Sequence, residues 1–317
     1  MGCLDPYAPP ASSGNLNALV IDGYIDANGT ASVLLSRSIP LNGKDAPPFE
    51  SEAVVTIESS NGDVFSLHED KDGSYSASGL SVDKSSTYTL HIVTIDEKDY
   101  RSDPMKVYST PPIDSVYWTI NGAERLEIRA DSHNDDPNGA RYYLFNAIET
   151  YEYHAEVFCH FKLVNHFPVE RLPEEEVFVC YKDERTLNVL ASSKGLKDNR
   201  ITGARVCTID RKSPKLAVPR YSILVRQIAI SDEEYNYQRL LLASTEQQGS
   251  LFAQIPGTIP SNMHSTKDPD EYVLGYFRAQ EVKELRYFID TYTHPIREIF
   301  IKGYISLVVS RKPLVNI

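Results

Sequence analysis

The sequence predicts a mainly β protein, in which a β-sandwich is followed by a larger β-rich domain that holds one α-helix. A chain of 317 residues is long enough for two domains, at ~100–200 residues each. It contains 20 Tyr against one Trp, and a ring with a polar tip suits half-buried strand positions. Short apolar segments alternate with turn dipeptides, which is typical of antiparallel sheets.

The first predicted domain spans residues 16–110, and its segments are short strands separated by turns such as Asn28-Gly29 and Asn61-Gly62. We expect strands at 18–25, 31–37, 53–58, 64–67, 73–77 and 87–93. Consecutive prolines interrupt strand pairing and stiffen the chain, so Pro111-Pro112 indicates a domain boundary.

The second predicted domain spans residues 111–317. We expect strands at 113–120, 125–130, 142–153, 176–181, 221–230, 272–279, 281–289 and 301–310, with an irregular stretch between the third and the fourth. A capping box at 231–234 predicts a helix over 232–246, because the Ser231 hydroxyl and the Glu234 carboxylate can satisfy free backbone amides.

Composition excludes two classes of partner or architecture. The formal net charge is −12 and the acidic residues are dispersed, which argues against nucleic acid as a partner. No window holds 18 consecutive apolar residues, so no transmembrane helix is predicted. Any membrane attachment must then be covalent or interfacial.

The sequence carries none of the common local signatures of enzymes, so we expect a non-enzymatic protein that needs no cofactor. His154, His160 and His166 recur six residues apart, which would place them on one face of a strand. Zinc sites usually combine close pairs of ligands on two elements, so exposed or half-buried histidines are favoured and no metal site is predicted.

The segment 131–139 resembles part of a calcium-binding loop, with Asp131, Asp135 and Asp136 as candidate ligands. It lacks the bidentate Glu at the twelfth position, and Asp, Asn and Gly are common in any tight turn, so a turn is favoured. Because binding residues concentrate in loops on a rigid scaffold, we expect the contact surface to include residues 131–141 and 155–175.

Cys3 is followed by a segment rich in Pro, Ser and Gly, which is typical of a lipid anchor with a flexible tether over residues 1–15. Under this hypothesis an export signal has been removed, and Met1-Gly2 are added start residues. The alternative is an ordinary cysteine in a frayed terminus. Cys159 can form a disulfide with Cys180 or with Cys207 in oxidising surroundings.

Several motifs together resemble a known family. They are Cys3 with its Pro-rich tether, Leu19–Ile25, Val33–Ser38, Ala53–Ile57 leading to Asn61-Gly62, Gly73–Tyr75, Tyr88–Ile92, Tyr100–Pro104, Pro111–Val116, Arg220–Gln227, Gly249–Phe252 and Asp268–Phe277. The chain is similar to an outer-membrane lipoprotein family of the Bacteroidota, domain of unknown function four-two-four-nine. The resemblance implies an immunoglobulin-like N-terminal module, a lipid anchor at Cys3, and genes adjacent to those of TonB-dependent receptors. It supplies no catalytic residues.

Two functions follow as hypotheses. In the first, the protein is lipid-anchored at the outer membrane on the cell surface, where it captures substrate for a β-barrel transporter of the TonB-dependent class. The sequence does not identify the ligand. In the second, it is a structural subunit of a larger outer-membrane assembly, such as machinery for protein export or barrel insertion, and binds no small ligand.

Overall fold

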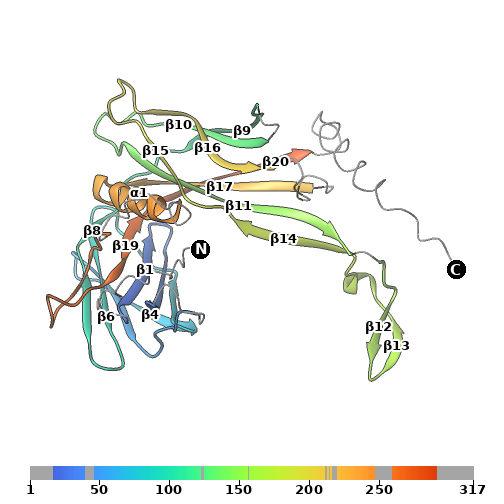
Figure 1. Cartoon of the computed structure of the whole chain (residues 1–317), viewed down its shortest axis with the longest axis horizontal. Helices are drawn as coiled ribbons and strands as arrows, with labels where there is room; N and C mark the ends of the chain where they lie inside the picture. Colours follow the sequence, from blue (N-terminus) through green and yellow to red (C-terminus); the bar gives the residue numbers. More distant parts are fainter. Residues whose placement is uncertain are drawn as a thin grey trace, which may run out of the picture. The chain divides into compact units, whose positions relative to one another are not determined.

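The computed structural model describes residues 17–39, 46–122, 125–155, 157–210, 213, 215, 220–246 and 259–290 (Figure 1). In this part of the chain the protein is mainly β with a single α-helix, which confirms the predicted fold class. No helix among these residues is both long and apolar enough to cross a membrane. Two compact units are present, unit 1 within Met1–Tyr108 and Asn236–Glu281 and unit 2 within Ser109–Tyr235 and Val282–Ile317.

Unit 1 is a sandwich-like arrangement in which one long sheet folds over at β4. The strands are β1 (Leu19–Asp26), β2 (Thr30–Arg37), β3 (Val54–Ser59), β4 (Val64–Lys71), β5 (Ser74–Ser78), β6 (Thr87–Val93), β7 (Asp99–Ser102), β8 (Met105–Lys106), β18 (Met263–Ser265) and β19 (Leu274–Gln280). They pair in the order β18-β7-β6-β3-β4-β5-β2-β1-β19, and β8 pairs with β6. The first half of β4 pairs with β3 and its second half with β5, so β4 joins two layers.

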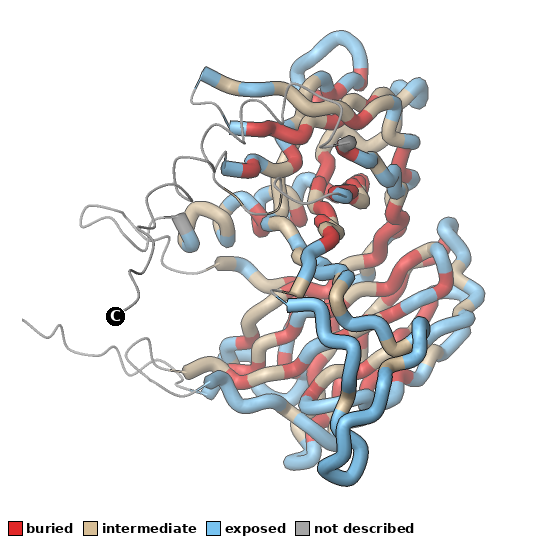
Figure 2. Tube along the Cα trace, turned by 90° about the vertical axis from the view of Figure 1, so that its right-hand side faces the viewer, coloured by how far each residue is buried: buried red, intermediate tan, exposed pale blue. Residues whose placement is uncertain are grey.

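Buried and more exposed side chains alternate along the strands of unit 1, and the buried ones form its core. Ile21 in β1, Val33 in β2, Ile57 in β3 and Leu90 in β6 are all fully buried, while their neighbours along each strand are more exposed (Figure 2). Successive side chains of a strand point to opposite faces, so each strand contributes every second residue to the core. Full burial of such a side chain contributes about 1.5–3 kcal/mol.

The chain returns to unit 1 through β19, which pairs in parallel with β1 from Val20↔Leu274 to Asp26↔Gln280. Residues 236–281 therefore belong with unit 1, whereas the sequence division at residue 110 places them in the second domain. Two parallel neighbouring strands need a long connection. In the sequence, most of unit 2 falls between β1 and β19 and forms part of this connection.

Unit 2 contains two larger sheets and a separate hairpin. Its elements are β9 (Ile113–Ile120), β10 (Leu126–His133), β11 (Tyr142–His154), β12 (Phe161–Val164), β13 (Phe167–Glu170), the 3-10 helix η1 (Pro173–Glu175), β14 (Val179–Arg185), β15 (Val189–Ser192), β16 (Arg200–Ile209), β17 (Arg220–Ile230) and β20 (Val282–Asp290). One sheet has the order β16-β10-β9 and another the order β14-β11-β17-β20. β15 also pairs with β11, and β12 pairs with β13.

The predicted helix is confirmed as α1 (Asp232–Glu246). Its start is capped as expected, because the Glu234 backbone N–H donates to the Ser231 hydroxyl at 3.0 Å. The chain between β11 and β14, for which the sequence predicts irregular structure, instead contains the β12–β13 hairpin. The predicted strand at 301–310 and the segment with Cys3 lie outside the described residues.

Gly275 is predicted to be essential for the pairing of β19 with β1. Its φ is +103°, and an added Cβ would lie 1.8 Å from the Ile21 carbonyl oxygen. We expect Gly275→Ala to lower the free energy of unfolding of unit 1 by more than about 2 kcal/mol, through backbone strain and steric overlap. Thermal unfolding followed by circular dichroism measures the effect. The control is Gly62→Ala, because Gly62 has φ +98° but no atom lies within 4 Å of an added Cβ. This variant should lower the free energy of unfolding only through backbone strain. An equal decrease in both variants would contradict the steric argument.

Candidate functional site

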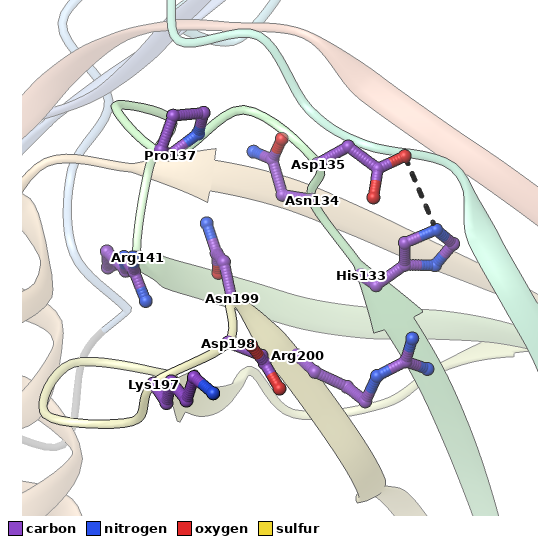
Figure 3. Close-up of a pocket in the computed structure, with 9 residues that line it drawn as sticks. All are labelled: His133, Asn134, Asp135, Pro137, Arg141, Lys197, Asp198, Asn199 and Arg200. Carbon is purple, nitrogen blue, oxygen red and sulfur yellow. Dashed lines mark ion pairs between the residues drawn. The ribbon is translucent and has the colours of Figure 1, made fainter.

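A polar pocket lies in unit 2 between the loop that follows β10 and the turn that precedes β16. Its volume is about 300 Å³. Nine residues line it, and all are polar or charged except one proline: His133, Asn134, Asp135, Pro137, Arg141, Lys197, Asp198, Asn199 and Arg200 (Figure 3). The first five lie in or beside the stretch 131–141, which the sequence analysis selects as a contact surface.

Buried hydrogen bonds around Asn199 hold the two walls of this pocket together. The Asn134 N–H donates to the Asn199 carbonyl at 2.8 Å. The Asn199 side chain accepts from the Tyr143 hydroxyl at 3.1 Å and from the Ser193 hydroxyl at 2.5 Å, and it donates to the Ala140 carbonyl at 2.8 Å. Burial also raises the pKa of the Tyr143 phenol. The pocket is therefore built on a fixed polar framework.

Basic side chains outnumber acidic ones around the pocket, with Arg141, Lys197 and Arg200 against Asp135 and Asp198. The Arg141 guanidinium donates to the Leu196 carbonyl at 3.3 Å. Among the described residues, no carboxylate lies within ion-pair distance of Lys197 or Arg200. Both of these side chains are exposed. The pocket thus offers cationic hydrogen-bond donors to a ligand with a carboxylate or phosphate group.

His133 is held by carboxylates at one side of the pocket. Its Nδ1 lies 2.7 Å from both carboxylate oxygens of Asp114. Its Nε2 lies 3.8 Å from Asp135, and this is the ion pair drawn in Figure 3. A carboxylate on one ring nitrogen fixes the orientation of the imidazole and leaves the other nitrogen facing the pocket residues.

The candidate cation ligands Asp131, Asp135 and Asp136 have separate environments. Asp131 lies within β10 and accepts from the Gly203 N–H at 2.6 Å and from the Tyr117 hydroxyl at 3.3 Å. The Asp135 side chain is 95% exposed. Asp136 accepts from the Asn138 N–H at 2.9 Å, as in an Asx turn. Within the described chain, no group of three or more His, Cys, Asp or Glu residues is arranged to hold a metal ion.

A second candidate surface is the arm, which we define as residues 157–178 between β11 and β14. Figure 1 shows the β12–β13 hairpin beyond the ends of those two strands. None of the described residues of the arm is buried. Nine of its apolar residues are exposed: Val157, Phe158, Phe161, Leu163, Val164, Phe167, Val169, Leu172 and Val177. The arm covers most of the stretch 155–175 that the sequence analysis also selects.

Aromatic contacts connect the base of the arm to the end of β11. The Phe158 ring lies 4.5 Å from the His160 ring and 5.5 Å from the Phe178 ring, and His154 stacks on Phe178 at 4.9 Å. A cavity of about 410 Å³ opens beside them, lined by Phe158, Cys159, His160, Glu170, Arg171, Leu172, Pro173 and Glu176. Two of the three histidines of the 154–160–166 series therefore take part in ring packing.

A partly buried ionic network lies in the sheet of β11, and no motif in the sequence indicates it. Glu149 accepts from the Tyr221 hydroxyl and from the Lys215 ammonium, each at 2.7 Å, and Lys215 also contacts Glu184 at 2.5 Å. Hydrogen bonds from Lys182, Lys215 and Tyr151 hold the pKa of Glu184 down at about 2. Burial raises the pKa of Tyr221 far above its ordinary value. None of these residues lines either cavity.

The three described cysteines, Cys159, Cys180 and Cys207, are free thiols, so neither of the two disulfides that the sequence allows is present. Cys159 is exposed and its Sγ lies 3.0 Å from the Phe161 carbonyl. Burial, together with the charge of Glu149, raises the pKa of the Cys207 thiol to about 12.

The fold and these surfaces describe a β-rich protein with a polar pocket and a projecting arm. Residues 5–286 match the family model described as Domain of unknown function (DUF4249), and the chain belongs to that family. A search of curated proteins found no match.

The Glu184 network predicts a specific acid sensitivity. The pKa of Glu184 is about 2 in the folded protein and near its ordinary 4.5 in the unfolded chain, so the unfolded state binds more protons between these values. The stabilisation is complete above about pH 5 and is lost as the pH falls towards about 2. We expect Glu184→Gln to reduce the fall in melting temperature over this range. Glu174→Gln, at an exposed glutamate of the arm, is the control; an identical response of both variants would contradict the assignment.

Cys159 and Cys207 should react with thiol reagents at very different rates. At pH 8 we expect iodoacetamide to modify Cys159 at least ~100-fold faster than Cys207, because the thiolate is the reactive species and each unit of pKa reduces its fraction about tenfold. Peptide mapping by mass spectrometry gives both rates in one sample. Comparable rates in the folded protein would contradict the raised pKa of the Cys207 thiol.

Proposed function

We propose that this protein is a non-enzymatic outer-membrane lipoprotein that captures a small substrate for a TonB-dependent transporter. The polar pocket is the observation that carries the capture role. The membrane location rests on Cys3 and its tether, and the transporter class on the resemblance of the sequence to outer-membrane lipoproteins of the Bacteroidota.

The pocket suits reversible binding of a small, negatively charged ligand. Its volume of about 300 Å³ lies at the low end of the range for small-molecule sites. Arg141 and Arg200 present planar guanidinium groups that can bind a carboxylate or phosphate through two hydrogen bonds. None of the nine lining residues is Ser, Thr or Cys, so the pocket lining supplies no hydroxyl or thiol nucleophile.

The arm favours a second candidate, a structural subunit of a larger outer-membrane assembly. A contiguous exposed apolar surface commonly marks an interaction site. In this role the arm would contact other subunits and the pocket would have no ligand. The two candidates differ in whether a small ligand stabilises the folded protein.

Membrane attachment is tested through Cys3. We expect the native protein to stay with outer membranes through repeated washing and Cys3→Ser to be washed off, because only the native cysteine carries the lipid and interfacial contact alone is reversible. A β-barrel protein of the TonB-dependent class should co-purify with the native protein after mild detergent extraction. Recovery of the native protein alone would contradict the proposed partnership.

Ligand capture is tested by thermal shift against small carboxylates, phosphates and anionic sugars. A ligand at 100 times its Kd stabilises the folded state by about 2.7 kcal/mol, so a clear rise in melting temperature is expected. The double variant Lys197→Gln, Arg200→Gln should abolish this rise. Lys71→Gln, which removes a charge far from the pocket residues in sequence and within unit 1, should retain it. A library without any stabilising ligand would favour the structural-subunit role.

A further inference from the structure

We propose that the tip of the arm, residues 163–169, inserts into the interfacial region of a lipid bilayer. This inference goes beyond the proposed capture function and depends on neither the pocket nor the lipid on Cys3. It rests on how the apolar and charged side chains are distributed over the β12–β13 hairpin.

The tip is a tight hairpin with a fixed register. Asn165 has φ 49° and His166 has φ 68°, and positive φ at both central positions is characteristic of a type I′ turn. The cross-strand pairs behind the turn are Val164↔Phe167, Leu163↔Pro168, Lys162↔Val169 and Phe161↔Glu170. The turn therefore determines which side chains share a face.

Apolar side chains lie on both faces of this hairpin. Directly opposed residues share a face and successive pairs alternate between faces. Leu163 and Pro168 thus lie on one face, and Val164 and Phe167 lie on the other. Leu163 is 76% exposed and Phe167 is 72% exposed. A flat protein surface would cover only one face, whereas a fluid apolar medium covers both, and this favours lipid as the occupant.

Charged side chains begin immediately behind the tip. Residues 163–169 include no Asp, Glu, Lys or Arg. Lys162 forms an ion pair with Glu175, and the Arg171 guanidinium donates to the Glu175 carbonyl at 3.2 Å. Together with Glu170 and Glu174, these residues form a polar collar around the base of the hairpin.

The dimensions of the tip fit the interface of a bilayer rather than its centre. Two paired positions and the turn, which together rise by about three residues at ~3.3 Å each, project about 10 Å beyond the collar. Interfacial elements bury apolar groups to about 5–10 Å. Deeper insertion would expose the unpaired outer edges of two strands to hydrocarbon, which is unfavourable. Pro168 lacks an N–H and so removes one such unpaired donor.

The collar also determines which lipids the tip prefers. It carries Glu170, Glu174 and Glu175 against Lys162 and Arg171, so its net charge is negative. Anionic headgroups would repel it. The tip should therefore bind neutral phosphatidylcholine vesicles better than vesicles that contain phosphatidylglycerol, the opposite of adsorption through basic residues.

The experiment uses the full chain with Cys3→Ser, so that an attached lipid cannot contribute, in flotation with phosphatidylcholine vesicles. The double variant Leu163→Asp, Phe167→Asp should reduce the bound fraction at least ~tenfold. The matched control is Leu187→Asp, Phe288→Asp, because these side chains are of the same types in the same unit and are 80% and 72% exposed. This control variant should bind the vesicles to the same extent as the reference chain, which carries Cys3→Ser alone.

Three results would overturn the proposal: no flotation of the Cys3→Ser reference chain, an equal loss of binding in the control variant, or stronger binding to phosphatidylglycerol vesicles.

The depth of insertion is measured with Leu163→Trp, whose added indole fluorescence should be quenched by brominated acyl chains. If the tip variant leaves flotation unchanged but loses a co-purified barrel protein, the tip is a protein-docking element and the lipid assignment is wrong. Failure here leaves the thermal-shift result and the co-purification of a barrel protein with the native chain unaffected, so it is distinguishable from failure of the capture function.

Discussion

The pairing of β11 with β17 is the interaction on which both candidate sites of unit 2 depend. The ladder runs without interruption from Tyr142↔Ile230 to Tyr151↔Tyr221. Buried side chains such as Phe145 and Val225 fill the sheet along it. Arg141 of the pocket precedes one end of β11, and the arm follows the other end at His154. A strand of 13 residues spans about 43 Å at ~3.3 Å per residue, so the two sites are held far apart on one rigid element.

The ionic network around Glu149 belongs to this same ladder. Strongly shifted pKa values in a cleft often mark a catalytic site, but here the shifted groups are paired with one another. The Glu149 carboxylate has Tyr221 and Lys215 as donors, and Glu184 has Tyr151 and Lys215. Their attraction offsets the cost of removing the charges from water, and breaking one pair would leave a buried charge uncompensated. We therefore interpret the network as structural.

The sequence predicts those parts of the fold in which one face of a strand is buried. β6 is recognisable because Tyr88, Leu90 and Ile92 alternate with half-buried residues. The β12–β13 hairpin lacks this alternation, since its apolar residues occupy both faces, so the periodicity rule finds no strand there. Pairing of β19 with β1 joins residues about 250 positions apart, and no local pattern contains that information.

One wall of the pocket can be predicted from local sequence, whereas the other is brought there only by the tertiary fold. The loop after β10 is recognisable from its Asp, Asn and Gly content, as the sequence analysis finds. Lys197 and Arg200 reach the pocket only because the Asn134 N–H bonds to the Asn199 carbonyl, and nothing near residue 199 indicates that this asparagine is buried. The family match over residues 5–286 covers both regions but assigns no role to either.

The arm differs from the rest of unit 2 in what its apolar residues do. An isolated two-stranded hairpin is at best marginally stable in water, and this one adds no buried residue to a core. Its order depends on the Asn165-His166 turn and on the aromatic contacts at its base. Side chains such as Leu163 and Phe167 contribute nothing to either feature, and exposed apolar strand edges promote aggregation. The proposed insertion into lipid would account for their presence, because a medium that surrounds the tip covers the apolar side chains on both of its faces.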